Sequence, residues 1–166
     1  MDLIIMIPFI IQGIAIAVDE AYFHVKRGLP LWERIGHPID TFTVVFCFGF
    51  VIFIPYSLTM LKVYILLSIL SCLTVTKDEW VHKHHCPGTE NWLHALLFIN
   101  HPILLTFAGL IWARAASVGP LWLKGLIARP EPLIQFLMVQ AALAALFMLY
   151  QIIYWNFIWK PSKATS

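Results

Sequence analysis

The sequence predicts an all-α membrane protein, a polytopic bundle in which about five helices cross the bilayer. Hydrophobic residues make up 60% of the 166 residues and charged residues only 12%, and the mean hydropathy is +0.80. A soluble domain of this length carries about twice that charged fraction. The formal net charge of +2 is too small for a nucleic-acid partner, which needs a basic face. Three cysteines, two of them inside apolar runs, exclude a disulfide framework.

Long uncharged runs locate the spans, because a helix needs about 20 residues to cross a hydrocarbon core about 30 Å thick. We expect a single transmembrane domain over residues 1–160, followed by a short tail at 161–166. The expected spans are residues 3–27, 37–61, 63–86, 91–115 and 132–159.

The first and third spans are apolar for only part of their length. Residues 3–18 are apolar and then meet Asp19 and Glu20, while the run 63–76 ends at Lys77. Both runs reach a spanning length only if the helix continues through the polar residues that follow. This continuation places carboxylates and imidazoles at the membrane end of each helix.

Basic residues are divided unequally between the two ends of the five helices. The end that follows the first span collects seven lysines and arginines, and the other end collects four. Because cytoplasmic loops are enriched in these residues, we expect the first end to be cytoplasmic and the N-terminus to lie outside. The expected location is a bacterial inner membrane, which the chain crosses several times.

All seven histidines and seven of the nine acidic residues fall at this same end of the bundle. Many are three or four residues apart, a spacing that puts side chains on one face of a helix. The sets expected to share a face are Glu20 and His24; His37 and Asp40; Asp78, Glu79, His82 and His85; and His94 and His101.

The polar segments 19–40 and 78–102 resemble each other. Each begins with Asp-Glu, passes a tryptophan and reaches a His-Pro pair. The step from Asp to Trp is 13 residues in one segment and 14 in the other, whereas the step from Trp to His-Pro is 5 and 9. If the similarity is a duplication, spans 1–2 and 3–4 form parallel hairpins that bring acids and imidazoles together. The fifth span has no counterpart.

Ionisable side chains within a span are costly and normally pair or face the bundle interior. A divalent metal ion removes most of this cost, and helical bundles hold two irons with Glu-x-x-His motifs and further glutamates. Glu79-Trp-Val-His82 has this form, and the step from Glu20 to His24 is one residue longer. We therefore expect two transition-metal ions, iron first and zinc as the alternative. The expected ligands are Glu20, His24, His37, Asp40, Glu79, His82, His85, His94 and His101, with Glu79 and Asp78 as catalytic groups.

Other residues of this end have a simpler expected role. Three acids are expected to be solvated or to pair with nearby basic residues: Asp19, Glu33 and Glu90. Four tryptophans are expected to be interfacial anchors: Trp32, Trp80, Trp92 and Trp155. His101 has a second interpretation, as a core histidine bonded to a backbone carbonyl that Pro102 frees.

The run VHKHHC at residues 81–86 follows acidic residues at a membrane edge and resembles the histidine boxes of membrane fatty-acid desaturases and hydroxylases. The resemblance covers residues 19–40 and 78–102. It implies two irons, held mainly by histidines at the cytoplasmic ends of membrane helices, that activate oxygen for attack on an unreactive C–H bond. This chain is shorter than that family, has more carboxylates and has no His-x-x-x-His.

Together these features favour a di-iron desaturase, hydroxylase or oxidase that acts on a lipid-soluble substrate and takes electrons from a donor. One alternative is an intramembrane zinc hydrolase of lipid esters or amides, because three ligands and an open position suffice for catalytic zinc. A third class is a non-enzymatic membrane protein that binds a metal or haem. Membrane lipids are the expected surroundings in every case.

Overall fold

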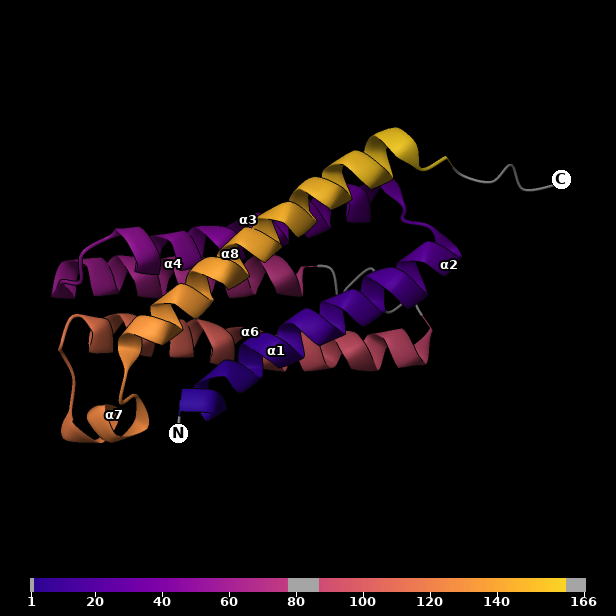
Figure 1. Ribbon diagram of the computed structural model, residues 1–166. Helices are drawn as coiled ribbons and strands as arrows, with labels where there is room; N and C mark the ends of the chain where they lie inside the picture. Colours follow the sequence, from indigo (N-terminus) through magenta and orange to yellow (C-terminus); the bar gives the residue numbers. More distant parts are fainter. Residues whose placement is uncertain (1, 78–86, 161–166) are drawn as a thin grey trace, which may run out of the picture.

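The computed structural model describes residues 2–77 and 87–160, and this part of the chain is built from helices (Figure 1). Five stretches are long and apolar enough to cross a membrane, which confirms the predicted all-α bundle. These stretches are Leu3–Arg27, Leu31–Phe53, Leu58–Thr76, Gly88–Ala115 and Pro130–Ile158.

The first span consists of three consecutive elements. α1 (Asp2–Val18) leads into η1 (Asp19–His24), a turn of π-helix, and α2 (Val25–Arg27) follows without a break. The prediction that this helix continues through its acidic residues is therefore confirmed. The chain turns at Gly28, whose φ of 71° suits glycine. A Cβ at this position would also lie 2.5 Å from the ring of Trp159.

α3 (Leu31–Phe53) begins and ends earlier than the predicted span 37–61. The helix starts directly after Pro30, whose fixed φ suits a position at a helix N-terminus. It stops before Pro55, because the residue that precedes a proline avoids the helical conformation. The polar residues between 31 and 40 therefore belong to the first turns of this helix.

α4 (Leu58–Thr76) also starts earlier than predicted. The hydroxyl of Ser57 accepts a hydrogen bond from the backbone N–H of Met60 at 3.2 Å and so caps the helix. With this start the helix has 19 residues, one of which is Lys62. The predicted continuation to residue 86 lies outside the described residues.

The remaining helices complete the bundle. α6 (Gly88–Ala115) crosses to the other end, where α7 (Leu121–Leu126) forms a short turn, and α8 (Pro130–Ile153) returns. The last turn of this span is a second π-helix, η2 (Tyr154–Ile158).

α1 packs along α6, while α3 packs against both α4 and α8 (Figure 1). Phe9 of α1 joins these pairs: its ring centroid lies 5.8 Å from that of Phe48 and 5.6 Å from that of Phe136. Toward the α7 end, the hydroxyl of Tyr64 donates to the carbonyl of Leu105 at 2.7 Å. The apolar core thus occupies the middle and the α7 end, and the polar side chains gather at the opposite end.

Asn100 holds α6 against α1. Its Nδ2 donates to the carbonyl oxygen of Pro8 at 2.7 Å and to Oε1 of Gln12 at 2.9 Å. Interhelical hydrogen bonds in membranes contribute about 0.6–1.7 kcal/mol. We expect Asn100→Ala to lower the free energy of unfolding by about 1 kcal/mol in a denaturing-detergent titration followed by circular dichroism.

Asn156→Ala is the matched control, because the Asn156 amide bonds to the carbonyl of Ile152 in its own span at 3.0 Å. An equal loss in both variants would contradict a role of Asn100 in joining the two helices.

Candidate metal centre

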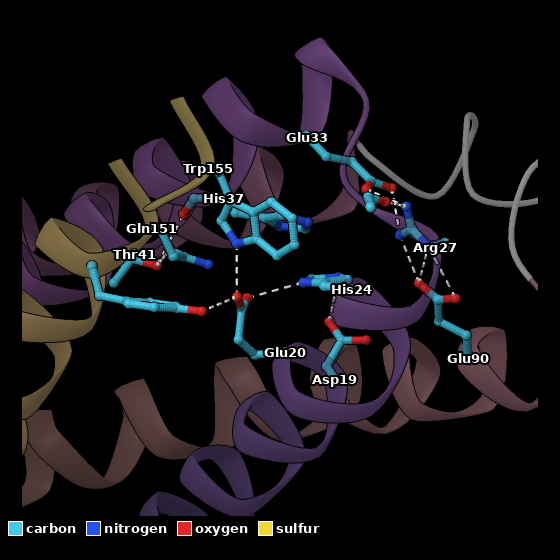
Figure 2. Close-up of polar contacts among 12 residues, drawn as sticks. Asp19, Glu20, His24, Arg27, Glu33, His37, Thr41, Glu90, Gln151 and Trp155 are labelled. Atoms are coloured by element: carbon cyan, nitrogen blue, oxygen red, sulfur yellow. Dashed lines mark hydrogen bonds and ion pairs between the residues drawn. The ribbon is translucent and has the colours of Figure 1, made fainter. Parts of the chain in front are cut away.

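Seven carboxylate and imidazole side chains meet at the end of the bundle where η1, α3 and α6 converge (Figure 2). Six of them are at most 6% exposed, and His37 is half-buried. We call this set the polar cluster; its members are Asp19, Glu20, His24, Glu33, His37, Glu90 and His94.

The π-helical turn explains how η1 supplies three members of the polar cluster. In a π-helix the hydrogen bonds join residues five apart, so Asp19 and His24 come to lie near each other. Nε2 of His24 is 3.1 Å from Oδ2 of Asp19, and Nδ1 is 3.0 Å from Oε2 of Glu20. In an uninterrupted α-helix a residue five positions on is rotated by about 140°. The imidazole of His24 can therefore contact both carboxylates only because the π-helical turn is wider than an α-helical turn.

Glu20 is held from the fifth span. Its Oε1 accepts a hydrogen bond from the indole N–H of Trp155 at 2.7 Å and from the hydroxyl of Tyr150 at 3.0 Å (Figure 2). The prediction that Trp155 is an interfacial anchor is wrong, since its side chain is fully buried at η2. A carboxylate behind a histidine is the usual support of a metal-binding imidazole, because it fixes the tautomer and the ring orientation. Glu20 thus orients His24.

The opposite edge of His24 lacks a complete set of hydrogen bonds. If the ring is neutral, with Nδ1–H donated to Glu20, Nε2 is an acceptor that faces Asp19 without hydrogen-bond geometry. Oδ2 of Asp19 accepts from Nε2 of His94 at 3.2 Å, while Oδ1 is buried with no hydrogen-bond partner among the described residues. Unpaired buried polar atoms are rare. A cation between these acceptors satisfies them.

Two sets of ligand atoms are compact enough to hold an ion. Asp19, His24, Glu90 and His94 each offer one atom within 4.8 Å of the others, and His24, Glu33 and His37 do the same. The rings of His24 and His37 stack with centroids 5.0 Å apart. The two possible positions therefore adjoin each other at His24.

Arg27 places one positive charge against the polar cluster. Its Nη1 lies 2.6 Å from Oε2 of Glu33, and its Nη2 lies 2.7 Å from Oε1 of Glu90. Both glutamates pair with a basic residue as predicted, but they are fully buried and not solvated. Arg27 pairs with two of the four carboxylates of the polar cluster, so the remaining negative charge must be compensated by imidazolium or by metal ions.

Three predicted ligands lie outside both groups. Glu20 supports His24 and belongs to neither group. Asp40 forms an ion pair with Nζ of Lys77 at 2.8 Å. His101 lies 2.9 Å from the hydroxyl of Ser71, between α6 and α4. This contact agrees with the interpretation of His101 as a core histidine, with a serine hydroxyl in place of the expected backbone carbonyl.

Four further predicted site residues lie in the segment 78–86, outside the described residues. They are Asp78, Glu79, His82 and His85. The roles of Glu79, His82 and His85 as ligands, and those of Asp78 and Glu79 as catalytic groups, stay predictions.

The starts of α3 and α6 share a sequence pattern that was not among the predictions. This pattern contains Glu33 and Glu90 of the polar cluster. α3 and α6 each begin after a proline, carry a glutamate three residues later and a histidine four residues after that. Glu33 and Glu90 make equivalent backbone bonds to these prolines, at 3.1 and 3.0 Å. The shared motif is thus Pro-x-x-Glu-x-x-x-His, and it aligns His94, not His101, with His37. Asp19 also belongs to the polar cluster, although it was expected to be solvated.

A cavity of about 100 Å³ opens beside the polar cluster and gives it space for a small ligand. The first span and α6 each contribute both polar and apolar side chains to its lining. The polar lining residues include Asp19, Glu20, His24, His37 and His94, and the apolar ones are Ile16, Val75, Leu97, Phe98 and Phe147.

Compared with protein-family models, with curated proteins and with solved structures, the chain shows no match. Its function is therefore inferred from the chemistry of the polar cluster.

Arg27 is expected to be essential for stability in the metal-free protein. Removing one member of a buried ion pair costs about 3–5 kcal/mol, because the remaining charge is left without compensation. Arg27→Gln should cause a loss of this size in a denaturing-detergent titration with a chelator present. Adding Glu33→Gln and Glu90→Gln should restore most of the stability.

Arg34→Gln is the control for this series. Its Nε donates to the carbonyl of Leu29 at 2.7 Å, and its guanidinium lies 4.5 Å from the centroid of the Trp159 ring. We expect this variant to lose about 1 kcal/mol. Failure of the two glutamine substitutions to rescue Arg27→Gln would contradict the account.

Proposed function

We propose that this protein is a membrane-embedded oxidoreductase that acts on a lipid-soluble substrate. It holds two transition-metal ions in the polar cluster, and iron is the favoured metal. The observation that carries the proposal is the meeting of two adjoining ligand groups at His24. Carboxylates and imidazoles from several helices of a bundle are the donor set of di-iron carboxylate proteins.

The donor atoms divide between the two positions. Glu20 holds Nδ1 of His24, so this ring can bind one ion through Nε2. We assign it to the position beside Asp19 and His94, which already approach each other. Glu33 and His37 then bind the ion at the second position, which requires that the ion pair between Arg27 and Glu33 opens. The second ion compensates the negative charge of Glu33 in place of the guanidinium.

When bound, two irons supply the activation of oxygen for attack on a C–H bond, and such chemistry requires an electron donor as a partner. The protein's residues prepare the site for this reaction. Tyr150 and Trp155 fix Glu20, and Glu20 keeps the proton on Nδ1 of His24. Leu97, Phe98 and other apolar residues of the cavity limit the access of water.

A zinc hydrolase is the second candidate, and one observation favours it. If Arg27 stays paired with both Glu33 and Glu90, the possible metal ligands that remain close together are Asp19, His24 and His94. Three protein ligands and an open position are typical of catalytic zinc. The number of ions per chain separates the two candidates.

Metal analysis of the purified protein tests the proposed function. The protein should be isolated without added metals and examined by elemental mass spectrometry and, after growth on ⁵⁷Fe, by Mössbauer spectroscopy. We expect close to two irons per chain and a spectrum of coupled high-spin ferric ions in the oxidised protein. One zinc per chain without iron would support the hydrolase, and a protein without bound metal would overturn both candidates.

Substitution of a single histidine should remove one ion. His24→Ala should lose the ion beside Asp19 and His94, because Nε2 of His24 is assigned to that ion and Glu20 holds its Nδ1. His94→Ala and His37→Ala should each keep about one ion, since each belongs to a single group. Elemental analysis of monodisperse, folded fractions provides the measurement.

His101→Ala is the matched control, because His101 contacts Ser71 and belongs to neither group. It should keep both ions. A loss of metal in His101→Ala as large as in His24→Ala would show that the site lies elsewhere.

A further inference from the structure

An apolar groove of about 460 Å³ leads away from the cavity beside the polar cluster. It is lined mainly by residues of α1, α3 and α8. Gln12, Ile16, Thr41 and Phe147 line both the groove and the cavity. The two spaces therefore adjoin each other.

The groove has a closed end and an open side. Its closed end is formed by the buried rings of Phe9 and Phe48, whose centroids are 5.8 Å apart. Along its rim, Ile10, Ile14 and Leu143 are 48%, 60% and 55% exposed. These residues belong to helices that span the membrane, so the open side faces lipid.

Small residues keep the groove open in the middle. Gly13 and Ala144 line it from α1 and α8. No atom lies within 4 Å of the position that a Cβ of Gly13 would take. A larger side chain at either position would fill space that the groove now leaves free.

We propose that this groove binds one acyl chain of a membrane lipid, with the chain end at Phe9 and Phe48 and the carbonyl end at the polar cluster. The apolar lining, the lateral opening toward lipid and the position next to the cavity beside the polar cluster support this occupant. Phe9 precedes Asp19 by ten residues, or about 15 Å along a helix. The closed end thus lies deeper in the membrane than the polar cluster, which matches the direction of an acyl chain below its headgroup.

Two amides at the junction suit the carbonyl end of such a chain. Oε1 of Gln12 accepts from Asn100 at 2.9 Å, and Oε1 of Gln151 accepts from Thr41 at 3.3 Å. Both side chains line the cavity, and their NH₂ groups can donate to an ester oxygen. The inference rests on the proposed function in one respect: it makes the carbons next to the acyl carbonyl those nearest the proposed metal ions.

Photo-crosslinking in lipid nanodiscs tests the binding of the chain. The probes are two phosphatidylcholines with a diazirine either at the acyl chain end or at a carbon next to the carbonyl, and labelled residues are identified by mass spectrometry. The chain-end probe should label the region of Phe9 and Phe48. The carbonyl-side probe should label the region of Gln12, Ile16 and Phe147.

Variants that fill the groove provide the decisive comparison. Gly13→Leu and Ala144→Leu should each reduce labelling at these sites at least tenfold and leave the metal content unchanged. Gly49→Leu and Ala142→Leu introduce the same side chain outside the groove. The probes should label these two variants to the same extent as the wild type. Equal labelling in all four variants, or labelling spread over every lipid-facing helix, would overturn the inference.

The two proposals fail in distinguishable ways. Specific labelling of the groove in a protein without bound metal would support lipid binding and overturn the oxidoreductase. A protein with two bound irons whose groove variants label like the wild type would support the metal site and overturn the acyl-chain site.

Discussion

The polar end of the protein depends on one constraint, the compensation of carboxylates that are buried in membrane-spanning helices. Asp19, Glu20, Glu33 and Glu90 are at most 6% exposed, and uncompensated charges at such depth are costly. The centre of the arrangement is the imidazole of His24, whose two nitrogens lie 3.0 and 3.1 Å from two different carboxylates. Other residues of this end either support this contact or compensate the remaining carboxylates.

Both π-helical turns serve this contact. η1 brings Asp19 and Glu20 to the same ring, and η2 brings the indole of Trp155 to Glu20. Such turns are rare and are found frequently at functional sites. The first span contributes Asp19, Glu20 and His24 to the polar cluster and also lines the apolar groove beside it. The oxidoreductase that we propose requires both a metal site and a site for hydrocarbon.

The sequence was sufficient to predict the all-α bundle, its five spans and the end at which the polar residues gather, since these follow from hydropathy and from helix length. It also predicted the contact of Glu20 with His24, which four-residue spacing favours. It did not predict Asp19, because a spacing of five is unfavourable unless the helix widens. It predicted that Glu33 and Glu90 pair with a basic residue but not that they are buried, because Arg27 compensates them inside the protein through contacts between residues up to 63 positions apart.

The metal site itself is the central claim, and anomalous X-ray scattering from crystals of the iron-loaded protein tests it most directly. The account predicts an anomalous peak about 2.0–2.2 Å from Nε2 of His24 and from donor atoms of Asp19 and His94. It predicts a second peak beside Glu33 and His37. Iron-loaded crystals in which the peaks lie away from these residues, with Arg27 still paired to both glutamates, would contradict the account.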